Sequence, residues 1–141
     1  MPLQQKLGIS LLIIRIATGL FILVWSIEKI LQPWVVQDVF SKFYFLKIST
    51  AMSTFLGIIQ TIIVLLFMAG LFKVWTYGLI LGMHGVSTLA SIKQLLSPYQ
   101  TPNHLFWAAV PTLAALIALF ILRNEDNMFV LAKKEPTLDV E

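Results

Sequence analysis

The stretch LGISLLIIRIATGLFILVWSIEKIL, residues 7–31, carries a single charged side chain, Arg15, before it reaches Glu28 near its end. About 20 helical residues cross a hydrocarbon core about 30 Å thick, so this stretch is long enough to span a membrane. Three further apolar runs of similar length follow at residues 50–69, 74–96 and 105–122. We therefore predict four transmembrane helices.

The composition supports a membrane protein, because 58% of the 141 residues are hydrophobic and only 12% are charged, against about 25% charged in soluble domains. The apolar runs lack the alternation of a membrane barrel, and open strands would leave backbone groups unpaired in lipid. The sequence thus predicts an all-α integral membrane protein with one four-helix transmembrane domain at residues 1–122 and a short cytoplasmic tail at residues 123–141.

The longest connection, QPWVVQDVFSKFYFLKIS at residues 32–49, is patterned like a helix. Pro33 suits a first helical turn, apolar side chains then recur at helical spacing, and polar ones such as Asp38 and Lys42 take another face. This pattern predicts a short amphipathic helix in the membrane interface. The alternative is a re-entrant connector that packs on the bundle. The connection at residues 70–73 is tight and predicts antiparallel neighbouring spans.

Basic residues orient the spans. Four spans put both termini on one side, called here the terminal side, and the opposite side is called the outer side. The basic residues divide six to four between the terminal side (Lys6, Arg15, Lys73, Arg123, Lys133, Lys134) and the outer side (Lys29, Lys42, Lys47, Lys93). By the positive-inside rule this excess predicts termini in the cytoplasm. No patch is organised for nucleic acid.

Polar side chains inside the spans are the candidate site, because each is costly in hydrocarbon and normally faces the interior of a bundle. At 1.5 Å per helical residue, one such side chain from each span lies between about 12 and 15 Å from the terminal side. This spacing predicts a midplane polar layer of Arg15, Gln60, His84 and Thr112, which either holds a ligand or holds the bundle together.

Two further groups of residues are expected to have separate roles. Near the outer side, a wetter polar cluster is predicted from Glu28, Lys29, Lys93 and His104, with snorkelling interfacial charges as the alternative. Gly78, Gly82 and Gly85 have the spacing of small residues that let another transmembrane backbone approach closely. That backbone could belong to a neighbouring span or to a second chain.

His84 has four interpretations: a haem ligand, a metal ligand, a structural residue or a functional residue. Haem ligation by both histidines is disfavoured because His104 is expected about 20 Å away along the hairpin, and too few ligands are suitably spaced for a metal. A structural hydrogen bond to Gln60 or Thr112 competes with a functional role, in which His84 and Arg15 hold a quinone carbonyl or relay a proton. The chain has no cysteine, so it has no thiolate chemistry of its own and no predicted intrinsic cofactor.

Two segments resemble the DoxX-like family of small four-helix bacterial membrane proteins: IRIATGLFILVWSIEKIL at residues 14–31 and IIVLLFMAGLFKVW at residues 62–75. Arg15, Lys29 and the turn at residues 70–72 match the family pattern, while Gln60 stands where an acidic residue is common. The resemblance covers roughly residues 7–122. It implies a bacterial inner-membrane protein whose relatives include a membrane subunit of a quinone-linked sulfur oxidoreductase and accessory factors.

Two classes of function therefore remain. The chain is either a small membrane subunit or accessory partner of a respiratory or sulfur-redox complex, with quinone as the candidate ligand, or a non-redox assembly factor that binds other transmembrane helices. In both cases we expect membrane lipid and other membrane subunits as partners. Independent catalysis is not expected, because the chain carries no set of redox-active side chains.

Overall fold

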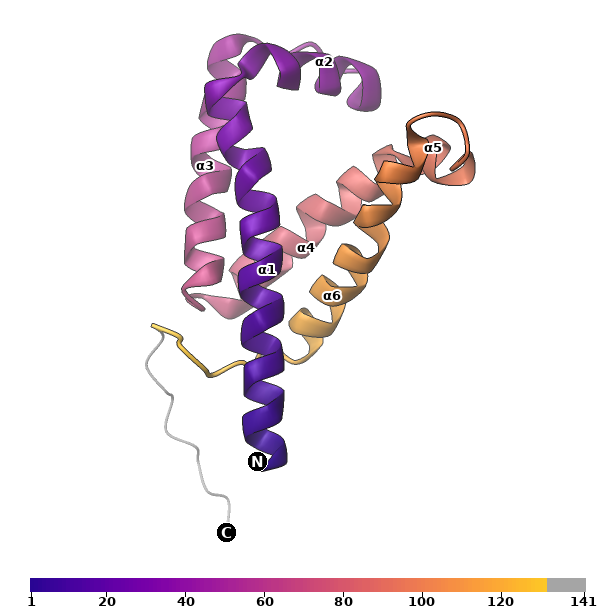
Figure 1. Cartoon of the computed structure of the whole chain (residues 1–141). Coiled ribbons are helices and arrows are strands. Elements are labelled where there is room, and N and C mark those ends of the chain that lie inside the picture. Colours follow the sequence, from indigo (N-terminus) through magenta and orange to yellow (C-terminus); the bar gives the residue numbers. More distant parts are fainter. Residues whose placement is uncertain (132–141) are drawn as a thin grey trace.

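The computed structural model describes residues 1–131, and every regular element in this part of the chain is a helix (Figure 1). The elements are α1 (Leu3–Leu31), α2 (Pro33–Tyr44), α3 (Thr50–Met68), α4 (Lys73–Ala90), α5 (Ile92–Leu96), the 3-10 helix η1 (Asn103–Ala108) and α6 (Ala109–Ile121). The all-α prediction is confirmed for these residues. Lys133, Lys134 and the end of the predicted tail lie outside the described residues.

Three helices are long and apolar enough to cross a membrane: α1, α3, and η1 with α6 as one 19-residue unit. These three helices support a membrane protein; the predicted span at 74–96 is not among them, so the fourth span stays a prediction. The predicted third span, 74–96, divides at Ser91 into α4 and α5. The Ser91 hydroxyl donates to the carbonyls of Ser87 (3.1 Å) and Thr88 (3.0 Å), and such local bonds bend or end helices.

Helix α1 extends past the other helices at the terminal side (Figure 1). Its 29 residues correspond to about 44 Å at 1.5 Å per residue, which exceeds a hydrocarbon core about 30 Å thick. Its first residues, through Lys6, are exposed. The N-terminal turns of α1 therefore project beyond the ends of α3 and α6.

Helices α1 and α3 pack closely because Gly57 lacks a side chain. A Cβ atom at Gly57 would lie 2.8 Å from Lys29 Cβ and 2.9 Å from the Ser26 carbonyl oxygen. Two hydrogen bonds cross the same contact, from Ser53 Oγ to the Lys29 carbonyl (3.0 Å) and from Thr61 Oγ1 to Ser26 Oγ (3.1 Å). Close approach of small residues with interhelical hydrogen bonds is how membrane helices associate.

The turn between α3 and α4 is tight, as predicted. Gly70 adopts φ = 68°, a left-handed conformation that costs glycine little. The N–H groups of Gly70 and Leu71 donate to the carbonyls of Phe67 and Leu66, both at 3.0 Å, which is the Schellman pattern of a helix end. The chain thus reverses at once, and α4 starts beside the end of α3.

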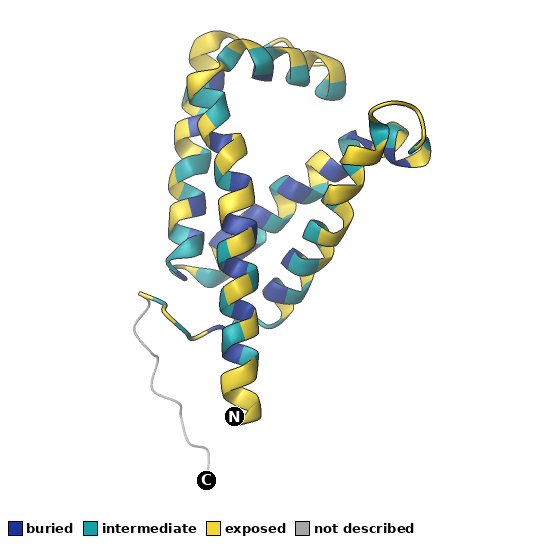
Figure 2. Ribbon diagram, viewed as in Figure 1, coloured by how far each residue is buried: buried dark blue, intermediate teal, exposed yellow. Residues whose placement is uncertain are grey.

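The helices form two pairs, α1 with α3 and α4 with α6, which converge at the terminal side and separate toward the outer side (Figure 1). The buried core contains Leu11, Phe67, Ile80 and Leu116, and Figure 2 shows buried positions on α1, α3, α4 and α6. The predicted helix after the first span is present as α2, which lies across the outer end; its place in a membrane interface stays a prediction. Its end reaches α4 through a 2.8 Å hydrogen bond between Tyr44 Oη and Ser87 Oγ.

Candidate functional site

Arg15 is completely buried, and its guanidinium forms an ion pair and hydrogen bonds with residues 126–129, which follow α6. Nη1 lies 2.7 Å from Asp126 Oδ1, and both side chains are 0% exposed. Nη2 donates to the carbonyls of Met128 (2.7 Å) and Phe129 (3.1 Å). A buried ion pair is stabilising only when further hydrogen bonds support it, and these two carbonyls supply such bonds to Nη2.

Asp126 is shared with helix α4. Tyr77 Oη donates to Asp126 Oδ2 (2.7 Å), and Lys73 Nζ donates to the Asp126 carbonyl (2.5 Å) and to Asn127 Oδ1 (3.0 Å). We call Arg15, Lys73, Tyr77 and Asp126 the terminal polar cluster. It joins α1, α4 and the segment that follows α6, so it ties both helix pairs together at the terminal side.

Residues 123–131 reach this cluster because they fold back across the helix ends (Figure 1). The Leu131 N–H donates to the Ala69 carbonyl (2.9 Å). Val130 packs against the bare face of Gly70, and Met128 packs against Gly8, where a Cβ would lie 2.9 Å from it. The part of the predicted tail that the structure describes is therefore docked on the bundle.

Arg15 does not lie at the predicted midplane depth. Its guanidinium is 3.4 Å from where a Gly70 Cβ would be, so Arg15 is level with the α3–α4 turn. The predicted depth was counted from residue 7, but the N-terminal turns of α1 project past the other helices, so this count placed Arg15 too deep. The expected layer is corrected in this respect: Arg15 belongs to the terminal side.

His84 makes a different hydrogen bond from either predicted one. Its Nε2 atom lies 3.0 Å from the carbonyl oxygen of Ala109 on α6, and Phe21 packs edge-on against its ring, 5.9 Å between centroids. A carbonyl oxygen can only accept, so Nε2 carries the proton. In the neutral ring Nδ1 is then an acceptor only. His84 thus joins α4 to α6, and Nδ1 of the neutral ring can accept one further hydrogen bond.

Gln60 and Thr112 are half-buried and do not meet His84. Thr112 Oγ1 donates to the carbonyl of Ala108, one turn earlier on its own helix (2.8 Å). Among residues 1–131, no hydrogen bond joins any two of Arg15, Gln60, His84 and Thr112. Ligand binding by these residues stays a prediction.

The four residues of the predicted outer cluster lie on separate elements. Glu28 lines a shallow pocket at the end of α1, and Lys29 Nζ donates to the Trp25 carbonyl of its own helix (3.2 Å). Lys93 lies on α5 and His104 is exposed on η1. Within the described part of the chain no ion pair connects them, since its one ion pair joins Arg15 to Asp126.

The predicted packing glycines make few contacts within the chain. A Cβ at Gly82 would meet nothing within 4 Å, one at Gly78 would lie 3.4 Å from Phe120, and one at Gly85 would lie 3.9 Å from Leu113. The close approaches inside the chain occur instead at Gly8, Gly19, Gly57 and Gly70. Gly82 is therefore left open on the outside of α4.

Asp126 is the member of the site that the sequence interpretation missed. It follows the last span in a polar segment, where a carboxylate is ordinarily solvated. The available signal was Arg15 itself, because an arginine at the end of a bundle needs an anion. Of the seven acidic residues in the chain, Glu125 and Asp126 are the first to follow the last span on the terminal side.

Neither a metal-binding group nor a similar known protein identifies the role of these residues. The described residues contain no group of three or more His, Asp or Glu side chains placed to hold a metal ion. Comparisons with protein-family models, with curated proteins and with solved structures each found no match to this chain.

Proposed function

We propose that this chain is a four-span membrane accessory subunit that binds transmembrane helices of a partner through one exposed stripe of α4. The stripe, called here the α4 seam, consists of Leu79, Gly82, Val86 and Leu89. The observation that carries the proposal is the empty space at Gly82, which a neighbouring backbone can enter.

The α4 seam has the geometry of a helix-packing surface. Its residues follow one another at spacings of three, four and three, which place them on one helical face. Leu79, Val86 and Leu89 are 46%, 56% and 70% exposed. They flank a glycine at which an added Cβ would meet nothing within 4 Å among the described residues, so a second helix can approach α4 closely there.

The direction of the chain supports a fourth span. Helices α3 and α6 both end at the terminal side, because the Ala69 carbonyl bonds Leu131 and Lys73 bonds Asp126. The chain must therefore return to the outer side between Met68 and Asn103, and α4 with α5 covers this distance. In this proposal α4 crosses the membrane beside α6, which covers its polar face at His84.

The cellular setting is proposed from the sequence. The excess of basic residues supports cytoplasmic termini, and the DoxX-like resemblance favours the inner membrane of a bacterium and a respiratory or sulfur-redox complex as partner. The chain would then contribute no catalysis of its own. If a quinone is held at His84, the acceptor at Nδ1 favours the hydroxyl of a reduced quinol over the carbonyl of a quinone. A non-redox assembly role is the alternative.

The proposal is tested by comparing Gly82→Leu with Ala114→Leu, a substitution at an exposed position of α6. Each tagged chain is expressed in a bacterial inner membrane, extracted in mild detergent and sized on a native gel. The expected result is a complex larger than the 15.9 kDa chain for wild type and Ala114→Leu, and a smaller species for Gly82→Leu.

A second experiment measures whether the complex binds quinol through His84. Extracted complexes of wild type and His84→Ala are assayed for bound quinol. Loss of quinol with an intact complex supports the redox-linked partner, whereas equal quinol content favours the assembly role. If Gly82→Leu leaves the complex unchanged, the seam is not the binding surface and the proposal fails.

A further inference from the structure

A pocket of about 440 Å³ lies between the end of α2 and the junction of α4 with α5. One wall is formed by Lys42, Phe43 and Phe45, and the other by residues 89–94, including Leu89, Lys93 and Gln94. Two contacts connect the end of α2 with the helices opposite. Tyr44 is hydrogen-bonded to Ser87 on α4, and Phe43 packs on Phe106 of η1, with ring centroids 5.8 Å apart. The pocket is therefore built from both helix pairs.

The pocket brings together two positive charges that the chain itself does not neutralise. The ion pair of the terminal polar cluster is the one ion pair found in residues 1–131, so no described carboxylate lies within 4.0 Å of either Lys42 or Lys93. Asp38 is on α2 one turn before Lys42 and also makes no ion pair there. Two unpaired ammonium groups beside one cavity suit a phosphate group.

Gln94, which also lines the pocket, contributes a hydrogen-bond acceptor that lacks a donor within residues 1–131. Its Oε1 atom is buried and has no hydrogen-bond partner among the described residues, and an unsatisfied buried acceptor is costly. A hydroxyl of a bound molecule would satisfy it. The pocket thus combines positive charge for a phosphate with an acceptor for a hydroxyl.

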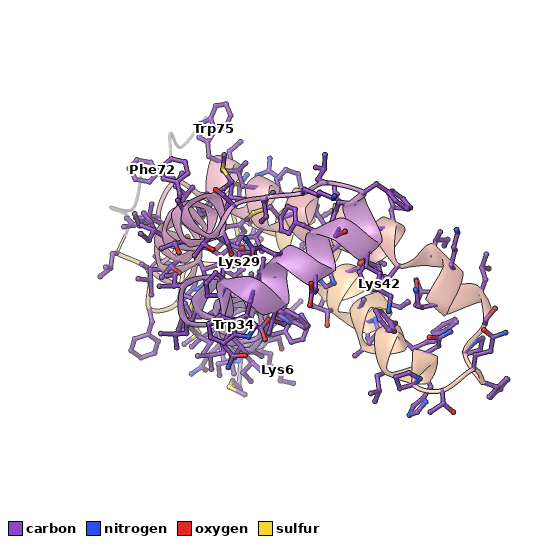
Figure 3. All side chains as sticks on the ribbon, turned by 90° about the horizontal axis from the view of Figure 1, so that it is seen from above. Lys6, Lys29, Trp34, Lys42, Phe72 and Trp75 are labelled. Carbon is purple, nitrogen blue, oxygen red and sulfur yellow. The ribbon has the colours of Figure 1, made fainter. Side chains whose placement is uncertain are left out.

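The rest of the pocket is apolar and lies where lipid headgroups would be. Phe43, Phe45 and Leu89 line it, and their side chains suit an acyl chain. Helices α2 and α5 both lie at the outer end of the molecule (Figure 1). Viewed from that end, Lys42 lies on the part of α2 that extends away from the α1–α3 pair (Figure 3).

We propose that this pocket binds one anionic phospholipid with a hydroxylated headgroup. The two lysines bind the phosphate, Gln94 accepts from a headgroup hydroxyl, and the aromatic wall packs on the acyl chain. This inference rests on the proposed membrane orientation of the chain, and the pocket shares only Leu89 with the α4 seam, so a failure of the Gly82→Leu test leaves it standing.

The test measures lipid binding to the purified full chain in nonionic detergent by native mass spectrometry. The probes are dioctanoyl phosphatidylglycerol, dioctanoyl phosphatidylcholine and inorganic phosphate. We expect one phosphatidylglycerol per chain, bound more tightly than phosphatidylcholine, and no competition by phosphate at equal concentration. Each lysine near a lipid phosphate is worth about fivefold in affinity, so Lys42→Gln with Lys93→Gln should weaken phosphatidylglycerol binding about thirtyfold.

The matched control is Lys29→Gln with Lys47→Gln, which removes the same charge from the same end but lies outside the pocket. This control should retain phosphatidylglycerol affinity within about twofold, since neither lysine lines the pocket. Lys93→Arg preserves the charge and should bind normally, which keeps the test valid if the double variant unfolds. Equal binding of the two lipids, an equal loss in the control, or full competition by phosphate would each overturn the proposal.

Discussion

Replacing Asp126 with asparagine should release the C-terminal segment from the bundle. The substitution keeps the shape and an acceptor for Tyr77 but leaves Arg15 charged and without its anion. Both side chains are 0% exposed, so water does not screen the loss. Removing one partner of a buried ion pair costs about 3–5 kcal/mol, which raises the open fraction of the segment between about 150-fold and 5,000-fold.

The absence of cysteine from the chain makes this release measurable. Val130→Cys places one thiol in the docked segment, on the face that covers Gly70. The rate of labelling by a membrane-impermeant maleimide then reports how often residues 123–131 leave the helix ends. The Asp126→Asn variant should be labelled faster by the factor above, up to the rate of a free thiol.

Glu125→Gln is the matched control, because it removes the same charge from the neighbouring, exposed residue. Its labelling rate should stay close to that of the parent. The Arg15→Met variant completes a double-mutant cycle, and Arg15→Met with Asp126→Asn should be less destabilised than the two single effects added together. Equal labelling of Asp126→Asn and Glu125→Gln would refute the buried-pair interpretation.

Three other substitutions test separate contacts. Gly57→Leu should destabilise the chain by about 1–3 kcal/mol or more in reversible unfolding, because its Cβ would lie 2.9 Å from the Ser26 carbonyl oxygen. Tyr77→Phe removes a hydrogen bond to a charged carboxylate and should cost about 1.5–3 kcal/mol in the same measurement. Tyr44→Phe removes the bond to Ser87 and should raise amide hydrogen exchange at the end of α2, by about threefold to tenfold.

Much of the fold could be predicted because hydropathy and local turn chemistry act over short distances in the sequence. The spans at 7–31 and 50–69 match α1 and α3 within a few residues. Pro33 begins α2 and Gly70 ends the α3 helix, each by a backbone preference that is visible in one residue. These features need no knowledge of which helices meet.

The terminal polar cluster could not be predicted in the same way. Arg15 and Asp126 are 111 positions apart in the sequence, and they meet only because the segment after α6 turns back under α1. Depth counting also failed for Arg15, since it started at residue 7, whereas the N-terminal turns of α1 project beyond the ends of the other helices. The end of α4 at Ser91 depends on side-chain bonds to its own helix, which hydropathy does not detect.

The two helix pairs are held together by stronger contacts at the terminal side than at the outer side. At the terminal side a buried ion pair, the Tyr77 bond and the Lys73 bonds hold them together. At the outer side the connection through α2 is one exposed hydrogen bond and one ring contact, and exposed bonds contribute less. Motion of α4 and α6 relative to α1 and α3 should therefore pivot about the terminal polar cluster. The proposed lipid pocket lies at the opposite end, between the two pairs, so a bound lipid would limit this motion.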